Sequence, residues 1–217
     1  MADLYILVGP PGCGKGTQAQ IICEKMNLTH FDMGSTLRSY ITKGDELALR
    51  ISSFTTKGEL VPIDIIKEVI ASAFKSISGT VVLDGFPRSL EQAQVLDEVI
   101  KEGNHKLRAI IFFDIDKDLL KTRIINRRVN PQTGEVFNIL TNMPANLEEY
   151  EKEHGKLIQR ADDTVDVFEN RFKVYLETTE PVIEYYKENP GIIKVNGANS
   201  INEIQAELTR IFSQEQA

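Results

Sequence analysis

The sequence predicts an α/β fold in which helices cover both faces of a parallel sheet. Short apolar runs, the first at 4–8, alternate along the chain with segments of helical periodicity. This alternation is typical of a parallel sheet that is buried on both faces. The first apolar run ends in a glycine-rich turn that leads into a helix. Because ligands in such folds bind beyond the carboxyl ends of the strands, we expect the functional site at that edge.

Composition limits the class of protein. The 217 residues are 41% hydrophobic and 26% charged, so the chain can form one large domain or a core with insertions. The net charge of −7 argues against a general nucleic-acid binder, although local arginine clusters could still bind small anions. The two cysteines, Cys13 and Cys23, are too few for a disulfide framework or a four-cysteine metal site. Since we find no signal-peptide pattern and no apolar run of membrane-spanning length, we expect a cytoplasmic protein that contacts no membrane.

Apolar runs and periodicity place the individual elements. Buried strands are expected where apolar residues run together, at 4–8, 28–32, 80–85, 109–115 and 192–195. Helices are expected where apolar residues recur at helical spacing, at 18–26, 35–60, 63–74, 89–100, 118–128, 164–188 and 200–212.

Local signals support several of these boundaries. Ser35 is a suitable N-cap for the second helix. Pro181 should bend or break the helix at 164–188, because proline removes a hydrogen bond inside a helix. Ser200 and Glu203 have the spacing of a capping box at the start of the last helix.

Two segments depart from the alternation of strands and helices. About 33–61 is helical and contains no strand, and 129–159 is polar and weakly periodic. A structureless loop of the second segment's length is uncommon inside a compact domain. We therefore expect a lid or a small subdomain there.

The glycine-rich stretch at 9–17, Gly-Pro-Pro-Gly-Cys-Gly-Lys-Gly-Thr, lies between a strand and a helix, the context of a phosphate-binding loop. Glycines let backbone N–H groups point at a phosphate, and the helix N-terminus adds partial positive charge. Lys15 would supply a mobile charge for the outer phosphates, and Thr17 a hydroxyl near phosphate or Mg²⁺. A turn that binds nothing would explain the glycines but not the Gly-Lys-Gly-Thr ending. Gly16 is a departure, since the general pattern has Ser or Thr directly after the lysine.

The stretch Asp-Gly-Phe-Pro-Arg at 84–88 follows the third apolar strand. A carboxylate at this position suits Mg²⁺, directly or through water, and Arg88 offers a planar fork for a phosphate. The alternative is a turn that carries a surface arginine. Gln92 has an alternative role as well, because Ser89 and Gln92 have the spacing of a capping box.

Arginines gather around the polar segment 129–159. They are Arg123, Arg127, Arg128, Arg160 and Arg171. Each one alone is typical of a solvated surface, but a group that flanks a lid favours a phosphate clamp. The three histidines, His30, His105 and His154, are scattered and suggest no catalytic triad. Phosphoryl transfer requires none, because it depends on positioning and charge stabilisation.

Together these motifs resemble the adenylate kinases, a family of nucleoside-monophosphate kinases, in the long form with an extended lid. The resemblance rests on 9–17, on 84–88 with Gln92, and on Arg-Ala-Asp-Asp at 160–163, which occur in this order, and it covers essentially the whole chain. It implies a P-loop three-layer core with a five-stranded parallel sheet, a small helical NMP-binding domain and a lid. The core would comprise 1–31, 62–128 and 160–217, the NMP-binding domain 32–61, and the lid 129–159.

The resemblance also implies the activity and its residues: reversible Mg²⁺-dependent transfer of the ATP γ-phosphoryl group to AMP, giving two ADP. The implied ATP-binding residues are Gly12, Cys13, Gly14, Lys15, Gly16, Thr17, Arg123, Arg127 and Phe137. The implied AMP-binding residues are Met33, Arg38, Leu60, Val61, Gly85, Arg88, Gln92, Arg160 and Arg171. The implied catalytic residues are Lys15, Arg88, Arg127, Arg160 and Arg171. Asp84 would hold Mg²⁺ through water, and the protein would be a monomer that binds no nucleic acid.

The chain departs from the family pattern at several positions. Met33 and Ser35 replace a threonine and an aspartate, which removes a hydroxyl expected at the AMP base and a carboxylate expected near Mg²⁺. The lid contains no cysteine, so we expect no structural zinc. Side-chain hydrogen bonds should hold the lid instead. The candidates are Asn130, Thr133 and His154.

Other functions remain open on the sequence alone. A UMP/CMP kinase or a GTP:AMP phosphotransferase would use the same motifs. A P-loop GTPase switch is disfavoured, because no asparagine here is followed by lysine, as a guanine-reading Asn-Lys-x-Asp motif requires. An inactive scaffold is disfavoured because Lys15, Asp84 and the arginines are retained.

Overall fold

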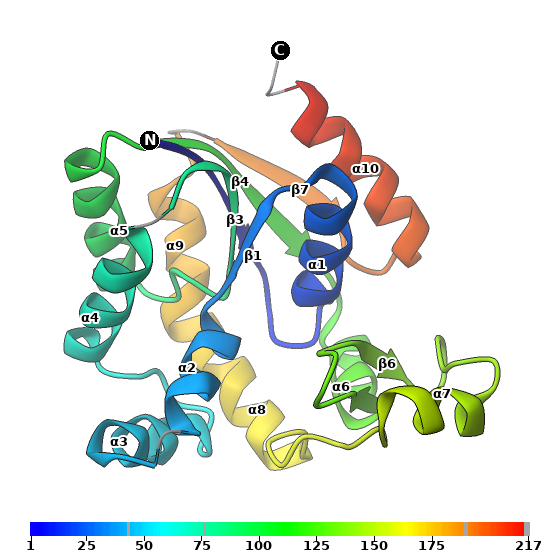
Figure 1. The fold of residues 1–217 in the computed structure, drawn as a ribbon. Coiled ribbons are helices and arrows are strands. Elements are labelled where there is room, and N and C mark those ends of the chain that lie inside the picture. Colours follow the sequence, from blue (N-terminus) through cyan, green and yellow to red (C-terminus); the bar gives the residue numbers. More distant parts are fainter. Residues whose placement is uncertain (43, 76, 189–190, 215–217) are drawn as a thin grey trace.

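The computed structural model describes residues 1–42, 44–75, 77–188 and 191–214. Its centre is a five-stranded sheet in the order β2-β3-β1-β4-β7, in which all neighbours are parallel (Figure 1). The strands are β1 (Ala2–Val8), β2 (Thr29–Asp32), β3 (Gly79–Asp84), β4 (Lys106–Asp114) and β7 (Ile192–Asn196). The predicted α/β fold and its five-stranded parallel sheet are confirmed, and β4 begins at Lys106 rather than at 109.

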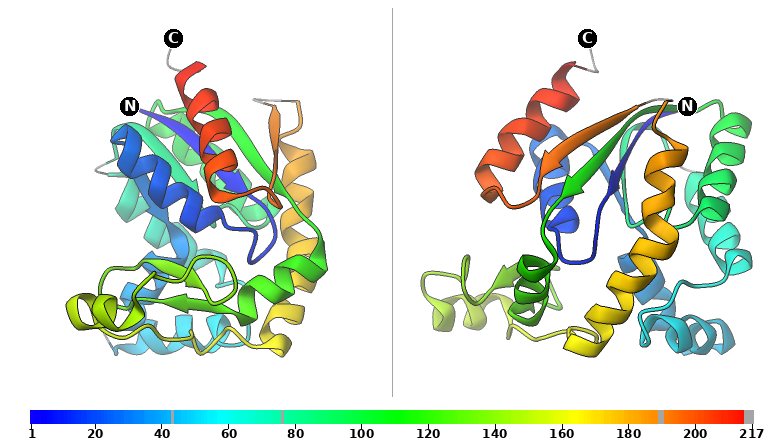
Figure 2. Two further views of the ribbon diagram at one scale, coloured as in Figure 1. Left: turned by 90° about the vertical axis from the view of Figure 1, so that its right-hand side faces the viewer. Right: turned by 180° about the vertical axis from the view of Figure 1, so that it is seen from behind.

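Helices cover both faces of the sheet. On one side lie α1 (Lys15–Met26) and α10 (Ile201–Gln214), and on the other lie α4 (Ile63–Phe74), α5 (Leu90–Glu102) and α9 (Glu180–Tyr185) (Figure 2). Alternate side chains of β1 enter two separate cores: Leu4 and Ile6 pack in one, Tyr5 and Leu7 in the other. Because side chains alternate along a strand, a central strand that is apolar throughout can form both layers.

The strand order places the glycine-rich loop at a reversal of the chain's path. From β1 the chain runs outward past β3 to β2, and from β3 it continues on the opposite side of β1 to β4. In open α/β sheets such a switch point opens a crevice at the carboxyl ends of the strands. The loop after β1, Asp32 at the end of β2 and Asp84 at the end of β3 all border this crevice.

Two short helices form the insertion between β2 and α4. They are α2 (Met33–Ile41) and α3 (Glu46–Thr55), where the sequence predicts one helical region. The predicted N-cap at Ser35 is wrong. The helix begins directly after β2, so Asp32 caps it, and its Oδ1 accepts a hydrogen bond from the Gly34 N–H at 2.8 Å.

The predicted helix at 118–128 is shorter than expected. Helix α6 (Lys117–Ile125) ends before the paired arginines, which lie on β5 (Arg127–Val129). Strand β5 pairs antiparallel with β6 (Val136–Asn138), and α7 (Leu147–His154) follows within the segment 129–159. Helical spacing therefore misassigns the two arginines, because pairing with β6 outweighs the local preference of the sequence.

The long C-terminal helix is interrupted, as Pro181 predicts. Helix α8 (Val165–Val174) passes through a π-helical turn, η1 (Tyr175–Thr179), into α9, whose first turn contains the proline. The capping box of α10 is also confirmed, since Ser200 Oγ accepts from the Glu203 N–H at 3.3 Å and Glu203 Oε2 accepts from the Ser200 N–H at 2.9 Å. Within the described residues, no helix is long and apolar enough to cross a membrane.

Candidate active site

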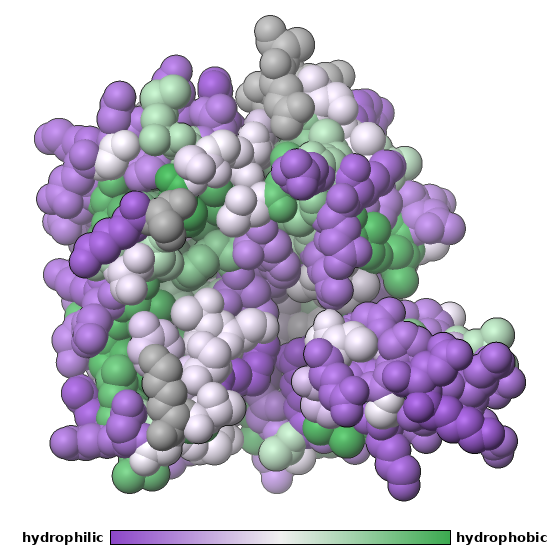
Figure 3. Space-filling model, in the orientation of Figure 1, coloured by the Kyte–Doolittle hydropathy of each residue, from purple (hydrophilic) through white to green (hydrophobic). Residues whose placement is uncertain are grey.

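A cavity of about 990 Å³ lies at the carboxyl ends of the strands, between α2, the glycine-rich loop and the segment 129–159. Figure 3 shows a recess between this polar segment and the α2 side of the molecule. All residues that the resemblance assigns to ATP, AMP or Mg²⁺ line this cavity, from Gly12 to Arg171. The structure therefore brings together motifs that are far apart in the sequence.

The loop at 9–17 wraps around the ammonium group of Lys15. Lys15 Nζ donates hydrogen bonds to the carbonyl oxygens of Gly9 at 2.7 Å and Pro10 at 3.1 Å, and lies 3.3 Å from Cys13 Sγ. Gly12 has a left-handed φ of 84°, and a Cβ atom there would lie 2.7 Å from Ile124 Cγ1. The loop thus has no room for a side chain at this point, and Lys15 is held at the start of α1.

Gly16, the departure from the general pattern, lies beside Asp84. A Cβ atom at Gly16 would lie 3.2 Å from Asp84 Oδ2, which is tighter than most real contacts. A Ser or Thr at this position would therefore crowd the carboxylate. Asp84 is 7% exposed, and His30 Nε2 lies 3.8 Å from its Oδ2.

The donor set around Asp84 fits a cation held mostly by water and phosphate. Among the described residues, no group of three or more His, Cys, Asp or Glu side chains is placed to hold a metal ion. A buried carboxylate beside the glycine-rich loop suits Mg²⁺, since Mg²⁺ keeps several waters and is bound by one or two carboxylates together with substrate phosphates. The residues present therefore fit Mg²⁺.

Arg88 is held at its backbone and at its side chain. Its N–H donates to Gln92 Oε1 at 2.8 Å, and its Nε donates to the Gly85 carbonyl at 2.7 Å. Burial within the walls of the cavity lowers the pKa of the Arg88 guanidinium, and the negative charge of Asp84 opposes this effect. Gly85 is needed here, because a Cβ atom would lie 2.7 Å from Arg88 Nη2.

Gln92 takes both of the roles that the sequence leaves open, because it takes part in the N-terminal cap of α5 and also lines the cavity. Ser89 is the N-cap of α5 and accepts from the Gln92 N–H at 3.2 Å. The Gln92 side chain reaches the Arg88 N–H rather than that of Ser89, so the capping box is shifted by one residue. Its amide nitrogen has no hydrogen-bond partner in the described part of the chain, and the residue lines the cavity.

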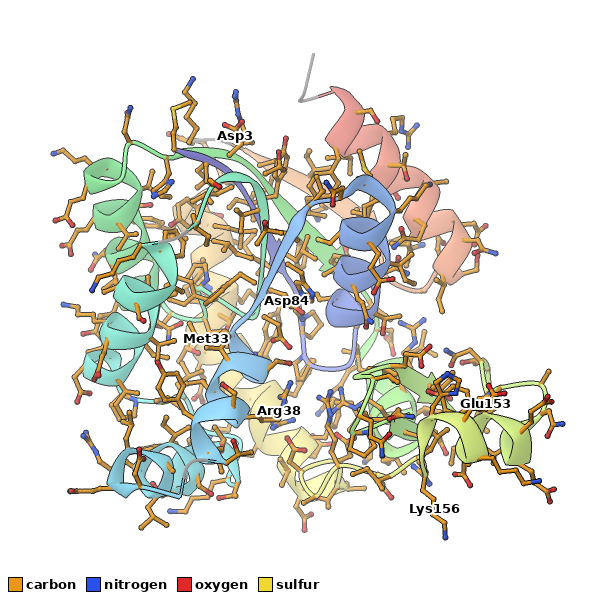
Figure 4. The ribbon with its side chains drawn as sticks, viewed as in Figure 1. Asp3, Met33, Arg38, Asp84, Glu153 and Lys156 are labelled. Carbon is orange, nitrogen blue, oxygen red and sulfur yellow. The ribbon has the colours of Figure 1, made fainter. Side chains whose placement is uncertain are left out.

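Arg38 projects from α2 toward the cavity, which it lines together with Met33 and Asp84 (Figure 4). Its Nη2 donates to Ser35 Oγ at 2.7 Å and lies 3.4 Å from Asp32 Oδ2. Ser35 Oγ in turn donates to Asp32 Oδ2. Burial raises the pKa of Asp32, but the bond from Ser35 and the charge of Arg38 outweigh it, so the pKa lies below its usual value. The carboxylate that position 35 lacks is therefore present nearby, at position 32.

Two carboxylates of the stretch 160–163 each bind one arginine. Arg127 Nε donates to Asp163 Oδ2 at 2.9 Å and its Nη2 donates to Oδ1, while Arg171 Nη2 donates to Asp162 Oδ2. Arg160 has no such partner among the residues described. Burial and the like charges of Arg127 and Arg38 lower the pKa of Arg160 to about 10. This concentration of positive charge favours an anionic ligand.

The neighbouring arginines of β5 have different surroundings. Arg127 lines the cavity, whereas Arg128 does not. Instead, Nη1 of Arg128 donates to the carbonyl oxygen of Arg127 at 2.7 Å. Successive residues of a strand point to opposite faces, so both cannot join the clamp. The expectation that Arg128 belongs to the cluster is wrong. Arg123 lines the cavity and links α6 to the loop after β7, since its Nη1 donates to the Gly197 carbonyl at 2.8 Å.

Side-chain hydrogen bonds join parts of the segment 129–159, and they involve Asn130 and Thr133 as predicted. By contrast, the His154 ring nitrogen hydrogen-bonds only to the Tyr150 carbonyl of its own helix among the described residues. Asn130 Nδ2 donates to Tyr150 Oη at 3.1 Å and to the His154 carbonyl at 2.8 Å. Thr133 Oγ1 donates to Glu135 Oε2 at 3.0 Å, and the same oxygen accepts from Tyr150 Oη at 2.5 Å. The His154 ring stacks on Tyr150 with centroids 4.6 Å apart. The sequence does not predict the hydrogen bonds of Tyr150 and Glu135, because these bonds depend on how α7 packs against the β5–β6 hairpin.

The comparisons with known proteins agree with this geometry. A family model described as "Adenylate kinase" matches residues 7–190. A protein named adenylate kinase from Petrotoga mobilis is 38% identical over 207 residues, which cover 95% of this chain and 96% of the relative. Proteins of the same name from Chloroherpeton thalassium and Methanocella arvoryzae are each 37% identical, and the matches cover 96% and 94% of this chain and 97% and 95% of the respective relatives.

Proposed function

The chain belongs to the adenylate kinase family of phosphotransferases, and we propose that it transfers the γ-phosphoryl group of ATP to AMP, reversibly and with Mg²⁺, giving two ADP. One observation carries the proposal. The described residues that line the cavity include seven cationic side chains but only four carboxylates, although the net charge of the chain is −7. Such a local excess of positive charge suits two nucleotides with several phosphates. The cationic residues are Lys15, Arg38, Arg88, Arg123, Arg127, Arg160 and Arg171.

The donor nucleotide would lie between the glycine-rich loop and the lid. The loop's N–H groups and the N-terminus of α1 would bind the phosphates of ATP. Lys15 would exchange its bonds to the Gly9 and Pro10 carbonyls for phosphate oxygens. Arg123 and Phe137 would border the donor's base side, since both line the lid end of the cavity.

The acceptor would lie on the α2 side of the cavity. Arg38 and Arg88 would hold the AMP phosphate, and the free amide nitrogen of Gln92 would contact the base. Met33, Leu60, Val61 and Gly85 would form the walls of this pocket. Met33 is 3% exposed and packs mainly in the core, so it would contribute a small apolar surface and no hydrogen bond.

The transferred group would pass between these two sites, surrounded by Arg127, Arg160 and Arg171. The acceptor is already an anionic oxygen, so no side chain need remove a proton. The arginines would stabilise charge as it spreads over the equatorial oxygens. Their carboxylate partners Asp162 and Asp163 would hold two of them in position before substrate binds. Mg²⁺, held by Asp84 through water, would neutralise charge on the phosphates.

The insertions would then close over the nucleotides. We propose that 32–61 forms the acceptor domain and 129–159 the lid, each moving against the core formed by 1–31, 62–128 and 160–217. Closure would exclude water, which would otherwise hydrolyse ATP. We further propose that the enzyme is a cytoplasmic monomer that binds no nucleic acid and no structural zinc.

A coupled assay tests the proposal. Purified protein is mixed with Mg²⁺, with ATP or GTP as donor, and with AMP, GMP, CMP or UMP as acceptor. The expected result is the highest kcat/KM for ATP with AMP, and loss of activity with EDTA. A preference for CMP or UMP would indicate a pyrimidine kinase, and a preference for GTP would indicate a GTP:AMP phosphotransferase. No turnover with any pair would indicate an inactive scaffold.

A further inference from the structure

The π-helical turn η1 contains a threonine whose hydroxyl reaches a distant part of the chain. Thr179 is 7% exposed, and its Oγ1 donates to the carbonyl oxygen of Arg88 at 2.8 Å. The two residues are 91 positions apart in the sequence. Thr178, which precedes it, makes only a local bond, from Oγ1 to the Val174 carbonyl at 2.7 Å.

This bond completes the set of contacts that hold Arg88. The N–H of Arg88 donates to Gln92 and its Nε donates to the Gly85 carbonyl. Neither contact holds the carbonyl group of Arg88. Thr179 does so, and the backbone of Arg88 is thereby fixed on both sides of its Cα atom.

The π-helical turn gives Thr179 its direction. A π-turn inserts an extra residue into a helix and shifts the face that later side chains present, and such turns are frequent at functional sites. Helix α8, which enters the turn, carries Arg171, and both Arg171 and Thr179 line the same cavity as Arg88. One continuous helical segment therefore carries one arginine of the cavity and holds another.

We propose that Thr179 is a positioning residue for the acceptor phosphate, acting through the carbonyl group of Arg88. This inference rests on the proposed function only in that Arg88 binds the phosphate of the acceptor nucleotide. It does not depend on which base the acceptor carries. A hydroxyl that served only to satisfy a buried carbonyl would affect stability without distinguishing acceptor from donor.

The test replaces the hydroxyl with a methyl group of similar size. Thr179→Val should raise KM for the acceptor roughly fivefold to tenfold, the effect of one lost hydrogen bond, and leave KM for the donor within about twofold. Thr178→Val is the matched control, since it removes a neighbouring hydroxyl with only a local partner, and it should leave both KM values within about twofold of wild type. Thr179→Ser should restore the acceptor KM, because serine keeps the hydroxyl.

The measurements use whichever monophosphate the wild type prefers. If that acceptor is not AMP, the proposed function fails, while the comparison between variants still decides the role of Thr179. Acceptor KM unchanged in Thr179→Val, or donor and acceptor KM raised equally, would overturn the inference. If Thr179→Val does not fold, Thr179→Ala and Thr179→Ser are compared. A higher acceptor KM in the alanine variant alone supports the inference, and equal values overturn it.

Discussion

Arg127 and Asp163 form a two-point ion pair at the base of the lid, through Nε and Nη2 of the arginine and both carboxylate oxygens. The Asp163 side chain is completely buried, whereas that of Arg127 is 19% exposed and lines the cavity. A fully buried carboxylate with one bidentate partner is stable only as long as the partner remains, because an unpaired buried charge is costly. The buried Asp163 carboxylate thus holds the Arg127 guanidinium in place at the wall of the cavity.

We expect Asp163→Asn to lower the free energy of unfolding by about 2–4 kcal/mol, because it leaves the Arg127 charge without its partner. Urea unfolding followed by circular dichroism measures the change. Asp166→Asn, at an exposed position of α8, is the control and should change stability by less than about 0.5 kcal/mol. An unchanged unfolding midpoint in Asp163→Asn would show that the pair does not stabilise the fold.

Lys15→Met should abolish turnover while the protein still folds. The ammonium group is expected to act as charge moves among the phosphates, where such a contact contributes several kcal/mol in a site with little water. The measurement is kcat with ATP and AMP, and Lys25→Met, in the last turn of the same helix, is the control. More than about a tenth of wild-type kcat, a loss below ~1.4 kcal/mol, would contradict the role given to Lys15.

The sequence predicts the layers of this fold well, because the signal for them is local. Successive side chains of the apolar run in β1 pack into two different cores, and residues at the ends of β1 and β3 line the cavity. Arg127 and Arg128 are misassigned because helical spacing continues into β5, and only the partner strand β6 decides between helix and strand. The same limit hides Thr179 and the pairing of Asp163 with Arg127, because the partners lie far apart in the sequence.

The dependence of the free energy of unfolding on pH, at acidic pH, should involve Asp32. Its pKa is lowered below the usual 3.8, so its contribution to stability is complete above that value and is lost as the pH falls through the lower folded-state pKa. Wild-type protein should therefore lose stability as the pH falls below about 4, and Asp32→Asn should lose less over that range. Urea midpoints at several pH values measure the slope, with Asp118→Asn on the exposed side of α6 as control. Parallel profiles for wild type and Asp32→Asn would contradict this role.

The lid should keep its structure without metal. Asn130 is completely buried, and its side-chain amide binds five groups of this segment, so Asn130→Ala should lower the thermal midpoint and favour proteolysis within 129–159. A chelator should leave the wild-type midpoint unchanged in the absence of nucleotide. Elemental analysis gives an independent check, and stoichiometric zinc in the purified protein would contradict hydrogen bonding as the means of holding the lid.

Choice of the acceptor base should depend on Gln92 more than on Met33. Gln92 Oε1 is bound to the Arg88 N–H, and the residue lines the cavity, so Gln92→Ala would remove the proposed base contact and would also loosen Arg88. We expect a higher KM for every acceptor and a loss of AMP selectivity on the order of 1 kcal/mol. Met33→Thr should sharpen the AMP preference modestly by adding a hydroxyl at the base. It should also lower stability by about 1–3 kcal/mol, because Met33 packs in the core.

These effects are measured as kcat/KM for AMP against CMP and UMP. Gln94→Ala is the matched control, since Gln94 lies two residues further along α5 and is exposed, so its ratios should equal those of wild type. The pattern separates two roles of Gln92. An equal loss for all three acceptors would show that Gln92 acts only by holding Arg88, whereas a larger loss for AMP shows that its amide also reads the base. Unchanged ratios and unchanged KM in Gln92→Ala would remove Gln92 from the acceptor site.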